Sequence, residues 1–168
     1  HYIENFLEAH RRDVKGRVLE VGDNTYTKRY GEGDVSRSDV LHYTDKNPEA
    51  DFVADLTDAP HLPSNTYDCI ILTETLQLIF DARAALRTLH RILRPGGVLL
   101  LTVPGITPAH AEFIGEGWYW SFTDTSIYKL LEESFLNSDI DVDAYGNILS
   151  GIAMLEGIAQ EELTEYEL

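Results

Sequence analysis

Hydrophobic positions along the chain follow two alternating patterns. Short, nearly continuous apolar runs are typical of strands that are buried on both faces of a parallel sheet. Runs of this kind occur at residues 67–72 and 98–103, and shorter or interrupted apolar segments lie at 17–22, 35–43 (with Asp39 and His42 as polar interruptions) and 51–54. Apolar residues at helical spacing predict helices at 2–13, 82–94, 123–135 and 148–163, and a last strand is expected at 140–145. This alternation predicts a three-layer α/β fold with a doubly wound, mostly parallel, Rossmann-like sheet.

Turn formers and length support one domain. Asp81 is a good cap for the helix that follows it, and Pro95-Gly96-Gly97 ends that helix sharply. The chain has 168 residues and neither an internal repeat nor a low-complexity linker. We therefore expect a single domain over 1–168, with an N-terminal helix (1–15), a ligand-binding core (16–104) and a loop with C-terminal elements (105–168).

Charge and composition narrow the possible partners. The net charge is −16, and from Glu112 onward thirteen acidic residues face one basic residue, Lys129. Such a surface repels phosphate backbones, so a broad nucleic-acid interface is not expected. The sequence has no apolar run of the length that spans a membrane, no signal sequence and a single Cys69, which favours a cytoplasmic protein. Residue 1 is His rather than Met, so a longer parent chain is left open, as is a homo-oligomer.

The residues at the expected strand ends indicate the class of ligand. Doubly wound sheets bind ligands outside the carboxyl ends of their strands, which directs attention to Gly22, Asp39, Asp55 and Thr73. A dinucleotide needs a glycine-rich turn without carboxylates for its pyrophosphate, whereas these strand ends are acidic. S-adenosylmethionine carries a sulfonium, an ammonium, a ribose diol and an adenine, which carboxylates can pair with or hydrogen-bond. The acidic pattern favours this second ligand.

Five motifs in order carry a family resemblance over approximately residues 14–135. They are Val18-Leu19-Glu20-Val21-Gly22, the acidic Asp39, Ala54-Asp55-Leu56, Tyr67-Asp68-Cys69-Ile70-Ile71-Leu72, and Leu93-Arg94-Pro95-Gly96-Gly97 with its following strand and Val103-Pro104. In this order the chain resembles the class I S-adenosylmethionine-dependent methyltransferases of the small-molecule type (methyltransferase type 11-like).

The resemblance implies a set of donor contacts. Glu20, Gly22, Asp23 and Asn24 would lie against the methionine part of the donor. Asp39 would take the ribose hydroxyls. Asp55 would face the adenine amino group and the Leu56 amide the ring, while Thr73 and Glu74 complete the pocket after the fourth strand.

Two positions depart from the family pattern. The first loop commonly reads Glu-x-Gly-x-Gly-x-Gly, but here only Gly22 of its glycines is present. We expect Asn24 to keep the turn, because Asn tolerates left-handed backbone better than most residues. Gln77 stands where relatives often have His, and it would be a polar substrate contact rather than a base.

The acceptor side is expected after the fifth strand. Trp118, Tyr119 and Trp120 end a Gly/Pro-rich loop, and their rings either stack on an acceptor or seal the core. His110 in this loop is a candidate catalytic base, with an ordinary exposed histidine as the alternative. The other histidines have no partner at metal-ligand spacing, so no metal site is expected.

These observations leave two hypotheses. The first is an enzyme that transfers a methyl group from S-adenosylmethionine, leaving S-adenosylhomocysteine, to a small-molecule acceptor such as a sugar or glycan precursor. The second is a catalytically inactive methyltransferase fold that serves as a binding or assembly module. The altered first loop keeps the second hypothesis open.

Overall fold

The computed structural model describes residues 2–106 and 117–158. Its centre is a sheet of five parallel strands in the order β3-β2-β1-β4-β5. The strands are β1 (Gly16–Val21), β2 (Val35–His42), β3 (Phe52–Val53), β4 (Tyr67–Thr73) and β5 (Leu93–Thr102). This sheet confirms the predicted fold class.

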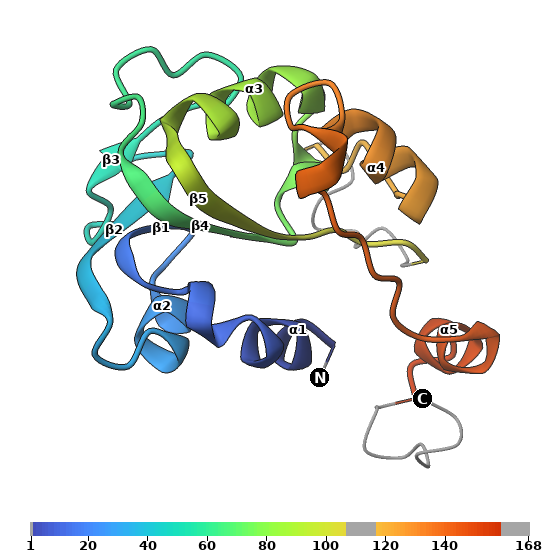
Figure 1. Ribbon diagram of the computed structural model, residues 1–168. Helices are drawn as coiled ribbons and strands as arrows, with labels where there is room; N and C mark the ends of the chain where they lie inside the picture. The colour runs from blue at the N-terminus through green and yellow to red at the C-terminus, as the bar shows by residue number, and fades with distance from the viewer. Residues whose placement is uncertain (1, 107–116, 159–168) are drawn as a thin grey trace.

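Helices cover both faces of the sheet (Figure 1). On one side lie α1 (Tyr2–Ala9), a 3-10 turn at Arg11–Asp13 and α2 (Thr25–Tyr30). On the other lie α3 (Ala82–Ile92) and α4 (Asp124–Leu131). The remaining elements are 3-10 turns η2 (Leu76–Leu78) and η4 (Asn137–Asp139) and the C-terminal helix α5 (Ile148–Leu155).

The two hydrophobic cores reflect the period of two along the strands. In β4, Ile70 and Leu72 pack in the cluster that includes α3, while Cys69 and Ile71 pack in the cluster that includes Leu7 of α1. Burial raises the pKa of the Cys69 thiol to about 12, so this cysteine is a core residue and not a reactive one.

Two sequence expectations about elements need correction, and one helix was missed. The segment 140–145 forms no strand, because Asp141 and Asp143 are exposed and only Val142 between them packs on the core. The helix α2 was not predicted from its sequence. β5 begins at Leu93, directly after α3, so the Pro95-Gly96-Gly97 turn lies within the strand as a register irregularity.

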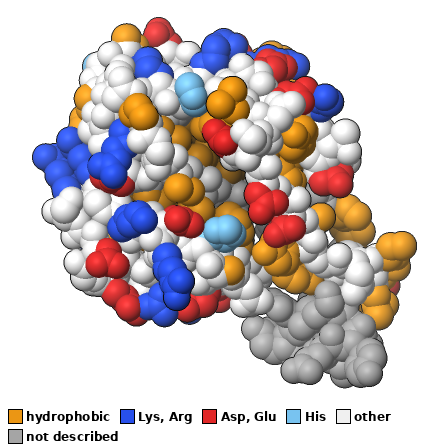
Figure 2. Space-filling view, viewed as in Figure 1, with side chains coloured by type: hydrophobic (Ala, Val, Ile, Leu, Met, Phe, Trp, Pro, Cys, Tyr) orange, Lys and Arg blue, Asp and Glu red, His pale blue; other side chains and the backbone are white. Residues whose placement is uncertain are grey.

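The C-terminal helix carries an apolar surface. Figure 2 shows hydrophobic side chains gathered at the lower right, where α5 lies in Figure 1. Its large exposed residues are Ile148, Leu149, Ile152, Met154 and Leu155. Even so, none of the helices in the described ranges is long and apolar enough to cross a membrane.

Candidate active site

The turn after β1 leaves open space at the carboxyl edge of the sheet. Gly22 has a φ of +102°, which favours glycine, and a Cβ added there would meet no atom within 4 Å. Its N–H donates to the Leu41 carbonyl (2.9 Å), and its own carbonyl accepts from Asn47 Nδ2 (2.8 Å). The turn is thus tied to the end of β2 while one face of Gly22 stays free for a ligand.

Glu20 holds the end of this turn in place through hydrogen bonds to the start of α2. Its buried carboxylate accepts hydrogen bonds from the Tyr26 N–H (3.1 Å), the Thr27 N–H (2.7 Å) and Thr27 Oγ1 (2.7 Å) at the start of α2. Burial raises the pKa of Glu20, while the bonds from Thr27 oppose that rise. Both carboxylate oxygens therefore hold α2 in place, and Glu20 is a positioning residue in this structure.

Asp23 and Asn24 follow Gly22 in the turn, and the left-handed backbone expected of Asn24 is wrong. Asp23 is exposed and accepts from the Thr25 N–H at 2.7 Å, and hydrogen bonding by Thr25 lowers the pKa of Asp23. Asn24 has a φ of −123°, so it does not keep the turn through left-handed backbone. That conformation belongs to Gly22, because glycine adopts it without a Cβ penalty.

The assignment of Asp39 to the ribose hydroxyls is not supported by the structure. Asp39 pairs with Leu19 in the middle of β2, not at its carboxyl end, and it is 1% exposed. Its two oxygens accept from Arg17 Nε and Arg37 Nε, each at 2.6 Å. A carboxylate held by two guanidinium groups inside the strand has no free edge for a ligand, so its role is structural.

Sequence reasoning missed Asp45. It is exposed and follows the end of β2 by three residues, beside the Asn47 that binds the Gly22 carbonyl. The signal was present, because the apolar run ends near Tyr43 and Asp45 is the first carboxylate after it. Asp45 occupies the strand-end position that Asp39 was expected to occupy.

Asp55 and Leu56 lie where the sequence placed them, directly after β3. Asp55 is exposed, and its Oδ1 accepts from the Thr57 N–H (2.8 Å) and Thr57 Oγ1 (2.7 Å). Leu56 is buried and anchors the turn in the core. The turn therefore presents a carboxylate and a backbone segment at the same edge as Gly22.

Glu74 follows Thr73 at the end of β4, in left-handed backbone with a φ of +45°. Its N–H donates to the carbonyl of Thr102 at 3.1 Å, which ties the turn to the end of β5. Gln77 is 1% exposed, and its Nε2 donates to the Glu74 carbonyl at 2.9 Å. Glu74 and Gln77 therefore form one unit on the β4–β5 side of the edge.

Aromatic residues lie beside this unit. The N–H groups of Tyr119 (2.8 Å) and Trp120 (3.3 Å) donate to the Gln77 carbonyl. The ring of Phe80, which sequence reasoning missed, stacks on Trp120 at 5.9 Å and meets Tyr119 edge-on at 5.3 Å. Trp118 is half-buried next to them. His110, the candidate base, lies outside the described residues.

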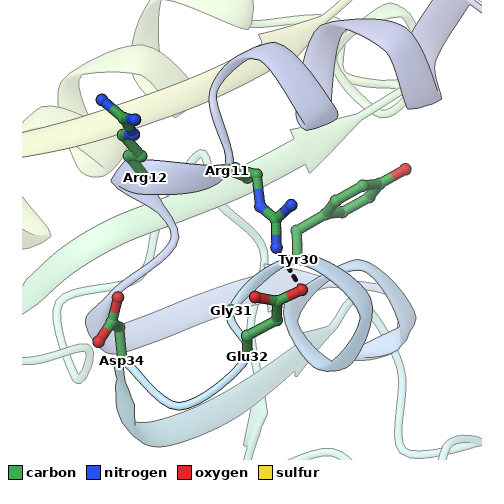
Figure 3. A pocket seen from close by; sticks show the side chains of 6 residues that line it. All are labelled: Arg11, Arg12, Tyr30, Gly31, Glu32 and Asp34. Carbon is green, nitrogen blue, oxygen red and sulfur yellow. Dashed lines mark ion pairs between the residues drawn. The ribbon is translucent and has the colours of Figure 1, made fainter.

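A hollow of about 320 Å³ lies away from this edge. Its lining residues are Arg11, Arg12, Tyr30, Gly31, Glu32 and Asp34, and an Arg11–Glu32 ion pair crosses it (Figure 3). Because Asp34 immediately precedes β2, this hollow is at the amino ends of the strands, opposite the Gly22 turn. Within the described ranges, no group of three or more His, Cys, Asp or Glu side chains is arranged to hold a metal ion.

Comparison with known proteins decides the family. Residues 15–101 match a family model described as a methyltransferase domain, which is more than half of the chain. The chain belongs to the class I S-adenosylmethionine-dependent methyltransferase family. This membership confirms the resemblance that the ordered motifs predicted, and the matched range contains Gly22, Asp45, Asp55 and Glu74.

Relatives of this methyltransferase domain are longer than the chain. The ubiquinone/menaquinone biosynthesis C-methyltransferase UbiE of Cellvibrio japonicus is 32% identical over 99 residues, which cover 58% of the chain and 37% of UbiE. The chain therefore spans little more than a third of the length of this relative.

Solved structures share the fold. Haemonchus contortus phosphoethanolamine N-methyltransferase 2, in complex with S-adenosyl-L-methionine, has a TM-score of 0.63 at 16% identity over 92% of the chain and 41% of its own. The [4+2]-cyclase SpnF has a TM-score of 0.58 at 18% identity over 79% of the chain and 56% of its own. The fold of this methyltransferase domain thus also occurs in a protein described as a cyclase.

Proposed function

We propose that this domain binds S-adenosylmethionine at the carboxyl edge of β1, β2 and β3 and methylates a small-molecule acceptor. The observation that carries the proposal is the open Gly22 turn with two exposed carboxylates at the same edge, Asp45 after β2 and Asp55 after β3. A free glycine face allows close approach of a ligand, and the carboxylates suit a cationic, hydroxyl-bearing ligand. A pyrophosphate would be repelled by the same groups.

Each part of the donor has a candidate partner in this arrangement. The Gly22–Asn24 turn, fixed by Glu20, would hold the methionine part. Asp45 replaces Asp39 as the candidate for the ribose hydroxyls. Asp55 and the Leu56 amide remain the candidates for the adenine, in keeping with their place after β3.

In such a reaction the protein mainly has to position the methyl donor and the acceptor relative to each other. When bound, S-adenosylmethionine supplies a methyl group on a strongly electrophilic sulfonium. The residues of the edge would hold donor and acceptor in line, which can supply a large part of the rate by itself.

A sugar or glycan precursor is the acceptor that the aromatic residues beside Gln77 favour, with Trp118, Tyr119 and Trp120 as contacts. A cytoplasmic location goes with this proposal.

A binding module without methyl transfer is the second candidate. The observation that favours it is the first loop, where Asp23, Asn24 and Thr25 replace glycine-rich sequence. The side chain of Asp23 turns back to the Thr25 N–H, which leaves the Gly22 face open and favours donor binding over its loss. The enzyme is therefore the leading proposal.

Calorimetric titration with S-adenosylmethionine and S-adenosylhomocysteine tests the donor site. We expect Kd values in the micromolar range for the wild-type chain. Asp55→Ala and Asp45→Ala should each weaken binding by about 1.5–3 kcal/mol, because each removes a charged hydrogen-bond partner. Asp34→Ala, the same substitution at the opposite edge, is the control and should bind normally. Absence of heat and of a thermal shift at millimolar donor would refute the enzyme and leave the binding module.

A further inference from the structure

Glu74 belongs to the β4–β5 half of the edge and not to the half with the Gly22 turn. Its N–H donates to both the carbonyl (3.1 Å) and the Oγ1 (3.3 Å) of Thr102 at the end of β5. The Gly22 turn, in contrast, is bonded to Leu41 and Asn47 on the β2 side. Since β4 lies between β1 and β5, these contacts separate the edge into two halves.

The Glu74 carboxylate has unused hydrogen-bonding capacity. It accepts from Thr102 Oγ1 and Gln77 Nε2, both at 3.4 Å, which are long hydrogen bonds. Among the ion pairs of the described residues, none includes Glu74. The side chain is half-buried, and burial raises the pKa of Glu74. A half-buried carboxylate with weak partners is suited to a hydrogen-bond donor from a ligand.

Gln77 adds a second acceptor beside it. Its Nε2 donates to the Glu74 carbonyl, and its Oε1 is buried without a hydrogen-bond partner in the described part of the chain. Buried polar atoms are usually paired, so such an atom marks a place where a donor is wanted. The half-buried Glu74 carboxylate and the buried Gln77 Oε1 therefore both offer hydrogen-bond acceptors in this half of the edge.

Three exposed rings lie in this half, with Phe80 and Trp120 stacked and Tyr119 edge-on to Phe80. Phe80 is 68% exposed, Tyr119 52% and Trp120 38%. Trp120 is fixed by the bond from its Nε1 to the Ile79 carbonyl (3.0 Å), and the Gln77 carbonyl holds the backbone of Tyr119. Hydrogen bonds through Gln77 thus link Tyr119 and Trp120, on which Phe80 packs, to the Glu74 carboxylate. Rings in this state stack on the face of another ring or on the C–H face of a sugar.

We propose that Glu74 and the rings of Phe80, Tyr119 and Trp120 form the acceptor subsite, for a ring compound whose reacting group is a hydrogen-bond donor. This inference rests on the proposed methyltransferase function and moves Glu74 from the donor to the acceptor. The Glu74 carboxylate and the net charge of −16 both disfavour an anionic acceptor. A hydroxyl and a protonated amine can both donate a hydrogen bond to the Glu74 carboxylate.

Matched small probes test the subsite on the intact chain with saturating S-adenosylhomocysteine. Benzyl alcohol, benzylamine and benzoate share one ring and differ only in the group offered to Glu74. Methyl glucoside and methyl glucuronide make the same comparison for a sugar ring. Binding is followed by calorimetry and by tryptophan emission. At least one probe that carries a hydroxyl or an amine should bind ten times or more tightly than its carboxylate analogue. Comparison of the alcohol, the amine and the sugar then identifies the kind of acceptor that the subsite takes.

Variants separate recognition from simple packing. Glu74→Gln should reduce the discrimination against benzoate to less than threefold, because Gln carries no charge. Phe80→Ala should weaken every ring probe about fivefold without changing that ratio. Glu8→Gln and Tyr145→Ala remove a carboxylate charge and an aromatic ring outside the subsite, and they should leave probe affinity and the discrimination against benzoate unchanged.

The outcomes distinguish this inference from the donor proposal. Failure of S-adenosylhomocysteine to bind the wild-type chain would refute the proposed function itself. Normal binding of S-adenosylhomocysteine with no probe bound, with benzoate bound as tightly as benzyl alcohol, or with full discrimination in Glu74→Gln, would overturn the acceptor subsite alone.

Discussion

Carboxylates in this protein have different tasks according to what surrounds them. Asp39 is enclosed by two arginines, Glu20 is occupied by backbone amides, and Asp55 is exposed with one oxygen committed to Thr57. Residue type alone indicated an acidic site that suits a cationic ligand, but it did not distinguish structural carboxylates from ligand-binding ones. The exposure of each carboxylate and the partner of each of its oxygens make that distinction.

Asp39→Asn distinguishes the structural role from the ligand role. We expect the free energy of unfolding to fall by about 1–3 kcal/mol, since the buried group loses its charged hydrogen bond with Arg17. S-adenosylhomocysteine affinity should stay within twofold of wild type. Chemical denaturation and calorimetry measure the two quantities, and an affinity loss like that of Asp55→Ala with normal stability would restore the ribose assignment.

The sequence was a good guide to which residues come near the edge and a poor guide to side-chain partners. Gly22, Asp55 and Glu74 were recognised because each lies at or just after the end of an expected strand, where the family resemblance places donor contacts. Asp39 was misplaced because a buried acid looks like a strand-end acid until Arg17, 22 positions away along the chain, is brought beside it. Phe80 was missed because its ring contacts lie 39 and 40 residues further along the sequence.

At the level of elements, strands were predicted better than short helices. Apolar runs identify β1, β2, β4 and β5 because parallel strands are buried on both faces. The six residues of α2, Thr25–Tyr30, contain two threonines and two tyrosines, which are only moderate helix formers. This helix depends on Glu20 of β1, a contact that local sequence does not reveal.

Thr27→Val tests the link between β1 and α2. The variant keeps the side-chain shape but loses the hydroxyl bond to Glu20, so the free energy of unfolding should fall by about 1 kcal/mol or more at neutral pH.

The same variant has a defined pH dependence. The hydroxyl bond favours the charged carboxylate, so its loss raises the pKa of Glu20 further above the ordinary 4.5. The deficit of the variant should therefore be largest above the folded pKa and should shrink as the pH falls and Glu20 becomes protonated. Urea unfolding across this range measures it, and a deficit independent of pH would contradict the link.

For the whole molecule, charge is the dominant feature. The net charge is −16, most of it from Glu112 onward, and like charges destabilise the compact state by mutual repulsion. The eight ion pairs that Lys and Arg make among the described residues relieve only part of this repulsion.

Salt should therefore stabilise the protein. Raising sodium chloride from about 10 to 200 mM shortens the Debye length from roughly 30 Å to less than 10 Å. We expect the Tm to rise by roughly 2–4 °C, the shift that about 1 kcal/mol produces in a chain of this size. Differential scanning fluorimetry measures it. A Tm that falls with salt would show that the ion pairs outweigh the repulsion.

The central position of β1 has a consequence for how the protein is made. β1 pairs with β2 on one side and with β4 on the other, and its Arg17 N–H bonds to Asp68, 51 residues later. At typical rates of synthesis this separation corresponds to roughly 3–10 s. During that interval one edge of β1 is on the ribosome-bound chain without its partner strand. The nascent chain therefore passes through a stage at which a chaperone, or a neighbouring nascent chain, competes with β4 for the same edge.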